Sequence, residues 1–199
     1  MSNSLLTEGD GQTSLTPEEL LELKPSLTTR SQLNEVERMN INEARGWALR
    51  PANLKRDDLA TDHFVRELHR RMFNRVWRWA GRYRTTERNL GWEPHRIAEG
   101  VRVLLEDAKF WLVNGTYPVP EAAVRMHHRL VVVHPWANGN GRHARLLADV
   151  LMAARGGEPL SWGARQDLAM PGSARTSYLT AMRAADGGDF SKLIQFSTS

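Results

Sequence analysis

The chain has 199 residues, of which 41% are hydrophobic and 25% charged, and its formal net charge is +4 at pH 7; these values are typical of one soluble domain with a sizeable core. Cysteine is absent, which excludes disulfides, thiolate metal sites and cysteine nucleophiles. Apolar runs such as Leu130 to Val133 are too short to span a bilayer, and the N-terminus lacks a secretion signal pattern, so we expect a cytoplasmic protein without a membrane partner.

The basic residues are mostly arginines that recur at helical spacing. They form no compact run with interleaved aromatic residues, which is the pattern that nucleic-acid binding favours. We therefore do not expect nucleic acid to be the main partner.

A short helix is expected within residues 1–28, after a loose polar tail. Thr16 and Glu19 have the spacing of a capping box, and Pro17 suits the first helical position.

A longer N-terminal helix is expected within residues 29–50. Thr29 and Gln32 form a second capping box, and Pro51 ends the helical pattern.

The rest of the chain, residues 51–199, is expected to be mostly helical. Apolar residues with helical spacing predict a succession of helices, marked by Phe64 to Val76, Ile97 to Leu112, Met126 to Val133, Leu146 to Leu151, Tyr178 to Met182 and Phe190 to Phe196. Alternating and turn-forming residues in 82–92 predict a short β-hairpin. The expected fold class is all-α with one small hairpin.

Residues 134–142 read His-Pro-Trp-Ala-Asn-Gly-Asn-Gly-Arg and lie between two of these helices. Gly139 and Gly141, on either side of Asn140, tolerate positive φ, so successive backbone N–H groups can turn toward an anion. The start of the following helix adds partial positive charge. This loop therefore suits phosphate groups.

Charged and titratable side chains flank the loop. Arg142 and Arg145, three residues apart, project toward one side of the helix and suit a polyphosphate. His134 can accept a proton near neutral pH, and Trp136 is expected to anchor the loop in the core. Each feature alone is common in purely structural contexts, but their combination in this order favours a functional site.

Residues 134–145 closely resemble the signature of Fic-domain proteins, His-x-Phe-x-Asp/Glu-Gly-Asn-Gly-Arg-x-x-Arg, with two positions substituted. The resemblance covers about residues 30–196, including the segment from Trp77 to Arg84, and is strongest to the bacterial subgroup called mobile mystery protein B. It implies a Fic-like helical bundle with a β-hairpin flap, in which residues 51–199 form the catalytic domain.

The resemblance also implies an activity, because most Fic proteins transfer AMP from ATP to a Ser, Thr or Tyr hydroxyl of a target protein. It makes His134 the general base and assigns the nucleotide phosphates to Asn138, Gly139, Asn140, Gly141, Arg142 and Arg145, of which Arg142 also stabilises developing charge. The flap would align the target by strand addition through Arg84, Thr85, Thr86, Asn89, Leu90 and Gly91.

Two residues depart from the signature. Trp136 replaces Phe and needs a roomier core. Asn138 replaces the Asp or Glu that in the family holds Mg²⁺; an amide oxygen is an uncharged ligand, so its affinity for the metal should be weak. We expect Mg²⁺ to be held mainly by the nucleotide phosphates.

Residues 31–36 resemble the inhibitory motif Ser/Thr-x-x-x-Glu-Gly/Asn of many Fic proteins, with Val36 as a departure. The motif begins at Ser31, and its Glu35 would pair with Arg145 and compete with a phosphate for the guanidinium. The alternative is that Glu35 forms a local surface pair with Arg38.

Several other functions are compatible with the sequence. The same residues could use another phosphate donor, transfer phosphate as Doc toxins do, or remove AMP with Glu35. Gly141, where Doc-like motifs have lysine, favours AMP transfer. A non-catalytic interaction module or a nucleic-acid binder is the alternative outside enzymes, and homo-oligomers are a further possible assembly.

Overall fold

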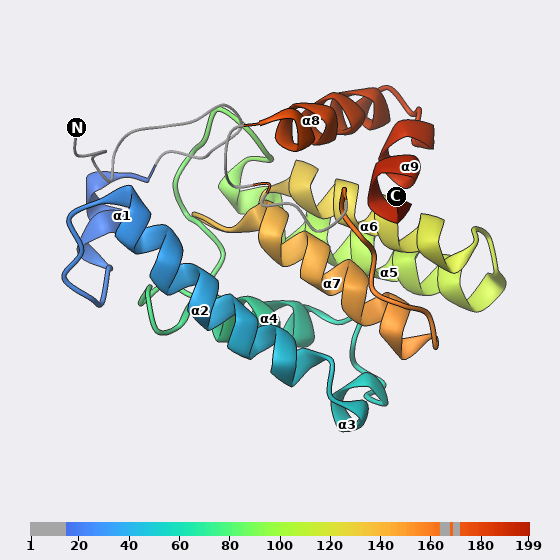
Figure 1. Ribbon diagram of the computed structural model, residues 1–199, viewed down its shortest axis with the longest axis horizontal. Helices are drawn as coiled ribbons and strands as arrows, with labels where there is room; N and C mark the ends of the chain where they lie inside the picture. Colours follow the sequence, from blue (N-terminus) through green and yellow to red (C-terminus); the bar gives the residue numbers. More distant parts are fainter. Residues whose placement is uncertain (1–14, 164–167, 169–171) are drawn as a thin grey trace.

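The computed structural model describes residues 15–163, 168 and 172–199, which form a helical bundle (Figure 1). Its helices are α1 (Pro17–Leu21), α2 (Arg30–Ala48), α3 (Pro51–Leu54), α4 (Asp62–Phe73), α5 (Ile97–Asn114), α6 (Val119–Val133), α7 (Asn140–Ala154), α8 (Ser173–Asp186) and α9 (Ser191–Thr198), with a 3₁₀ turn η1 (Pro94–Arg96) before α5. Among the described helices, none combines the length and hydropathy that a bilayer crossing requires. The mostly helical fold class is confirmed.

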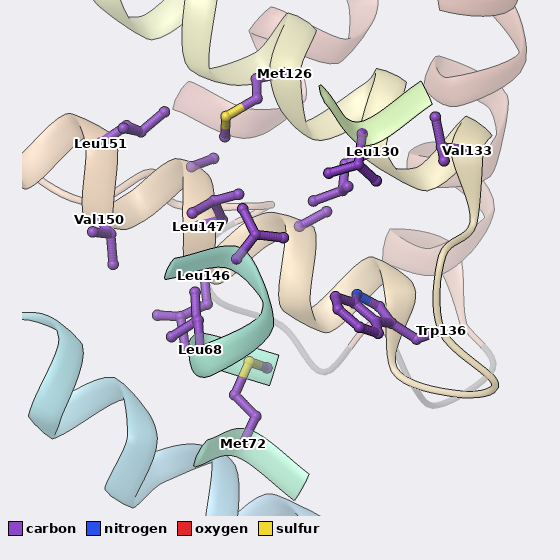
Figure 2. Close-up of a cluster of buried hydrophobic side chains, with 14 of the residues drawn as sticks. Leu68, Met72, Met126, Leu130, Val133, Trp136, Leu146, Leu147, Val150 and Leu151 are labelled. Atoms are coloured by element: carbon purple, nitrogen blue, oxygen red, sulfur yellow. The ribbon is translucent and has the colours of Figure 1, made fainter. Parts of the chain in front are cut away.

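The core lies between α4, α6 and α7 (Figure 2). Side chains from all three helices meet there and are almost fully buried, namely Leu68, Met72, Met126, Leu130, Val133, Leu146, Leu147, Val150 and Leu151, with Trp136 from the loop between α6 and α7. Burying each large apolar side chain contributes about 1.5–3 kcal/mol relative to exposing it. The α6–α7 pair is therefore a rigid support for residues 134–139. Around it, α5 packs on α6, α2 on α4, and α8 on α9.

The predicted helix boundaries hold where local signals set them. The capping boxes at Thr16 and Thr29 are both formed. Gly115 ends α5 in the left-handed conformation, with φ of 62°. The helix marked by Phe64 to Val76 ends earlier than its apolar pattern, because α4 ends at Phe73 and the chain continues in turns.

The predicted β-hairpin in residues 82–92 is wrong, since this segment contains no strand. The backbone N–H groups at its two ends bond to the end of α6 and the residues after it: Arg84 N–H donates to Pro135 O at 2.9 Å and Trp92 N–H to Val133 O at 3.2 Å. Tyr83 packs on the Trp136 ring at 4.9 Å between centroids. The backbone partners that a hairpin would supply thus come from a distant part of the chain.

Candidate functional site

His134 ends α6 with a left-handed backbone, at φ 55° and ψ 57°. Non-glycine residues rarely adopt this conformation, so surrounding contacts must hold it. The Arg84 Nε–H donates to the His134 carbonyl at 2.7 Å. Gly91, with φ of 88°, lies so close that a Cβ there would be 2.4 Å from the His134 Cβ. Residues 84–91 therefore pack directly on His134.

The His134 imidazole is neutral near pH 7. Its side chain is 6% exposed. Burial, followed by the charge of Arg84, lowers its pKa to about 4; a hydrogen bond with the Val131 backbone opposes these effects, and the charge of Arg88 adds to them. A neutral imidazole can accept a proton from a hydroxyl that approaches it.

The side chains that pack against the loop before α7 fix the shape of its backbone. Gly139 has φ of 83°, and a Cβ there would lie 2.3 Å from the Phe73 ring, so the position requires glycine. The Asn140 side chain is used within the loop: its Nδ2 donates to Trp136 O at 2.8 Å and its Oδ1 accepts from Trp136 N–H at 2.9 Å. The Asn140 side chain is therefore occupied within the loop, and only its backbone N–H, in the first turn of α7, is left for a ligand.

Two buried histidines support the loop from below, and the sequence reasoning missed both roles. His69 stacks on Trp136 at 4.0 Å between centroids, accepts from Gly81 N–H and donates to the Asn138 carbonyl. His143 accepts from Trp136 Nε1–H and donates to Val65 O. Burial is the main cause that lowers the pKa of each ring, so both are neutral near pH 7.

Arg142 is held by a residue that the sequence reasoning also missed, Glu37 of α2, which is 1% exposed. Its Oε2 accepts from the Arg142 guanidinium at 2.6 Å. Its Oε1 accepts from Asn138 Nδ2 at 2.9 Å and from Trp77 Nε1 at 2.7 Å. A carboxylate outside the motif thus joins α2 to two motif residues. The sequence carried one indication of this role, because Glu37 is a charged residue on the same face of α2 as the buried Leu33.

The predicted inhibitory contact of Glu35 with Arg145 is wrong. The Glu35 carboxylate accepts from Arg38 at 2.6 and 3.0 Å, and its side chain is 55% exposed. Ser31 is exposed as well. The reason is helical phase: at about 100° per residue, Glu35 lies on the opposite side of α2 from the buried Glu37.

Asn138 does not provide a metal site with the residues around it. Its Oδ1 accepts from Gly139 N–H at 2.8 Å, and its Nδ2 is bonded to Glu37. No group of three or more histidine, aspartate or glutamate side chains in the described residues could hold a metal ion. The donor set therefore does not fit a Mg²⁺ ion held by the chain alone.

Arg145, one turn after Arg142, faces Tyr178 of α8. Its guanidinium lies over the Tyr178 ring, 5.5 Å from the ring centre. Arg142 and Arg145 thus lie in the first two turns of α7, and His134 lies at the other end of the same loop.

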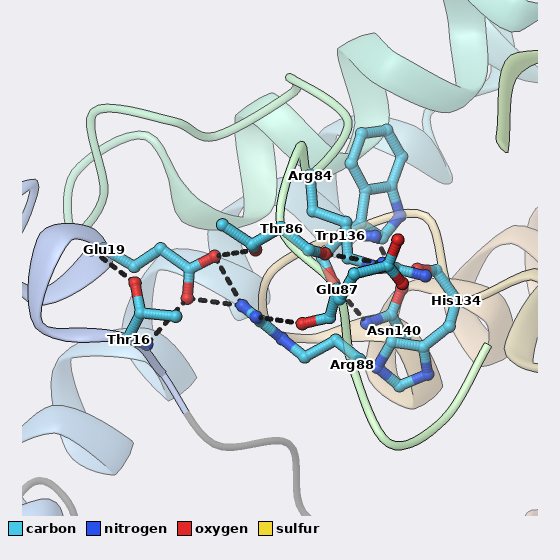
Figure 3. Close-up of polar contacts among 9 residues, drawn as sticks. All are labelled: Thr16, Glu19, Arg84, Thr86, Glu87, Arg88, His134, Trp136 and Asn140. Carbon is cyan, nitrogen blue, oxygen red and sulfur yellow. Dashed lines mark hydrogen bonds and ion pairs between the residues drawn. The ribbon is translucent and has the colours of Figure 1, made fainter. Parts of the chain in front are cut away.

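Residues 84–91, which are expected to bind the target, contact α1 through hydrogen bonds and an ion pair (Figure 3). The Glu19 carboxylate accepts from the Thr86 hydroxyl at 2.9 Å and forms an ion pair with Arg88. Arg84 is buried and bonded to backbone carbonyls on both sides. The other predicted target-binding residues are exposed, namely Thr85, Asn89, Leu90 and Gly91.

Residues 59–152 match the sequence model of the Fic/DOC family. The chain contains a Fic/DOC family domain. Glu19, Glu37 and Tyr178 lie outside the matched residues, so their contacts extend the Fic site with parts that the family match does not cover.

The chain is similar to curated adenylyltransferases over part of their length. It is 32% identical to the protein adenylyltransferase fic-1 of Caenorhabditis elegans over 70% of this chain and 27% of that protein. It is 26% identical to the protein adenylyltransferase Fic of Nematostella vectensis over 95% of this chain and 43% of that protein. The chain therefore spans less than half of these relatives.

Solved structures share the fold. A Fic-1 variant from C. elegans aligns with a TM-score of 0.65 and 25% identity, over 87% of this chain and 50% of that one. The BepC protein of Bartonella tribocorum, solved with bound AMPPNP, aligns with a TM-score of 0.67 and 16% identity, over 91% of this chain and 96% of that one.

Proposed function

We propose that the protein is an adenylyltransferase that transfers AMP from ATP to a Ser, Thr or Tyr hydroxyl of a target protein. The observation that supports this most directly is the joint placement of a neutral His134, the first turn of α7 and two arginines at one loop. The names of the curated relatives and the ATP analogue in the BepC structure support the same reaction.

In this proposal His134 accepts the proton of the target hydroxyl as its oxygen attacks the α-phosphorus. The new bond joins that oxygen to phosphorus, the bond to the bridging oxygen breaks, and pyrophosphate leaves. The N–H groups of the first turn of α7 and the guanidinium groups of Arg142 and Arg145 stabilise the charge that develops on the phosphates. Mg²⁺ would come bound to ATP, since the described residues near the loop offer no donor set for the metal.

We further propose that Glu37 inhibits the site in the resting protein. A phosphate that reaches Arg142 must compete with a buried carboxylate 2.6 Å from the guanidinium. This replaces the role expected for Glu35. We also propose that the chain belongs to the mobile mystery protein B subgroup.

The donor chemistry is tested with ATP labelled at either the α- or the γ-phosphate, added to the purified protein with and without cell extract. Adenylyl transfer retains the α-label on protein, and His134→Ala should abolish it. Retention of the γ-label alone would indicate phosphate transfer, and labelling that persists in His134→Ala would remove His134 from its role.

A further inference from the structure

The two arginines of the motif have different kinds of partner: one is a charged carboxylate and the other a neutral phenol. Arg142 pairs with the Glu37 carboxylate. Within residues 15–163, 168 and 172–199, Arg145 forms no ion pair with a carboxylate; its guanidinium lies over the Tyr178 ring, 5.5 Å from the ring centre. Among these residues, the side chain packed against the Arg145 guanidinium is therefore a neutral phenol.

The hydrogen bonds around Tyr178 have a defined direction. Toward Arg145 the phenol oxygen can only act as an acceptor, because a guanidinium only donates. The phenolic proton is then available to His127 of α6, whose Nε2 lies 3.1 Å from that oxygen. His127 is fully buried, and burial followed by the charge of Arg145 lowers its pKa well below the usual value, which keeps Nε2 able to accept.

Packing leaves the Tyr178 side chain little freedom. It is 6% exposed, and its ring lies 5.9 Å from those of both His127 and Phe196. Its hydroxyl also reaches the first turn of α7: a Cβ at Gly141 would lie 3.8 Å from it and 3.4 Å from an Arg145 nitrogen. Tyr178 and Arg145 thus lie next to the backbone N–H groups that are proposed to bind phosphate.

We infer that Tyr178 is a positioning residue that holds Arg145 over the first turn of α7 for the terminal phosphate of a nucleoside triphosphate. A phenol suits this task because it accepts a hydrogen bond without cancelling the positive charge. An aspartate or glutamate in its place would compete with the phosphate. The inference rests on the proposed nucleotide site, but it concerns binding and does not require that transfer occurs.

The test is the equilibrium affinity for ATP, ADP and AMP of the wild type and Tyr178→Phe, measured also with Glu37→Gln present in both so that Glu37 does not mask binding. Loss of the phenol oxygen, a polar neighbour of a charged group, should weaken ATP binding about tenfold. AMP, which lacks the terminal phosphates, should bind equally well to both proteins. Tyr117→Phe is the matched control, because Tyr117 lies against Trp111 and Arg125, away from the motif.

A double-mutant cycle tests whether Tyr178 acts through Arg145. In an Arg145→Ala background, Tyr178→Phe should cause no further loss of ATP affinity. An equal loss for all three nucleotides, an unchanged affinity for ATP, or the absence of nucleotide binding by any of the proteins would overturn the inference. If ATP binding shows the predicted pattern but no AMP is transferred, the inference stands and the adenylyltransferase proposal fails.

Discussion

Arg142 and Arg145 are one turn apart on α7, and their partners come from opposite ends of the chain. Glu37 lies in the N-terminal α2 and Tyr178 in the C-terminal α8. The motif itself was readable from the sequence because its residues are contiguous. These partners were not, because pairing with residues in other helices depends on how the helices pack and not on local spacing.

Glu35 and Glu37 form a natural pair for testing inhibition. Glu37→Gln removes the charge that competes for Arg142 but keeps the side-chain shape, so we expect AMP transfer to rise about tenfold or more. Glu35→Gln, on the exposed face of α2, should leave transfer unchanged. Rates of α-label incorporation measure both.

The opposite outcome has a clear meaning. If Glu37→Gln lowers transfer while Glu35→Gln does not, Glu37 orients Arg142 and Asn138 for binding and the inhibitory proposal is wrong. Thermal melting of both variants shows whether a change in folding accounts for either result.

At the scale of elements, the helices could be predicted from the sequence, whereas the conformation of residues 82–92 could not. The capping boxes of α1 and α2 and the left-handed Gly115 are set by neighbouring residues, so pattern and structure agree. Residues 82–92 have the alternation of a hairpin, but their backbone partners are residues 133–135. Nothing within the segment specifies that pairing.

Helix α1 should control the mobility of residues 82–92 through Glu19. The Glu19 and Arg88 side chains are only 12% and 5% exposed, so their ion pair is screened little by water. Glu19→Gln keeps the capping box, in which glutamine also serves, but removes the ion pair. We expect faster amide hydrogen exchange in residues 84–92 and unchanged exchange in α6 and α7.

The matched control is Glu22→Gln in the next turn. Glu22 pairs with Arg82 at 3.0 Å, but those side chains are 38% and 59% exposed, and such surface pairs contribute about 0–1 kcal/mol. Exchange in residues 84–92 that is equal in both variants would show that Glu19 has no special role.

At the scale of the whole molecule, buried neutral histidines tie stability to pH. His69, His127, His134 and His143 all have a pKa below the usual value near 6.5, with burial as the main cause. Below about pH 6.5 the unfolded chain binds protons that the folded chain does not. The stability contributed by the neutral rings is therefore complete above pH 6.5 and is lost as pH falls toward 4.

The free energy of unfolding should thus decrease between pH 7 and pH 5, by up to about 1.4 kcal/mol per pH unit for each histidine that titrates. Urea denaturation at a series of pH values measures this. Composition alone does not predict this pH dependence, because burial of these rings follows from the packing of α4, α6 and α7. A flat profile between pH 7 and pH 5 would contradict the assigned burial and neutrality.

The central claim is that the loop between α6 and α7 transfers AMP with His134 as base. Its most direct test is the intact mass of the purified protein after incubation with ATP and Mg²⁺, with Glu37→Gln present to relieve inhibition. We predict a mass gain equal to AMP on the chain or on an added target protein, and no gain when His134→Ala is combined with Glu37→Gln. A gain equal to phosphate, no gain in either variant, or an AMP gain without His134 would contradict the claim.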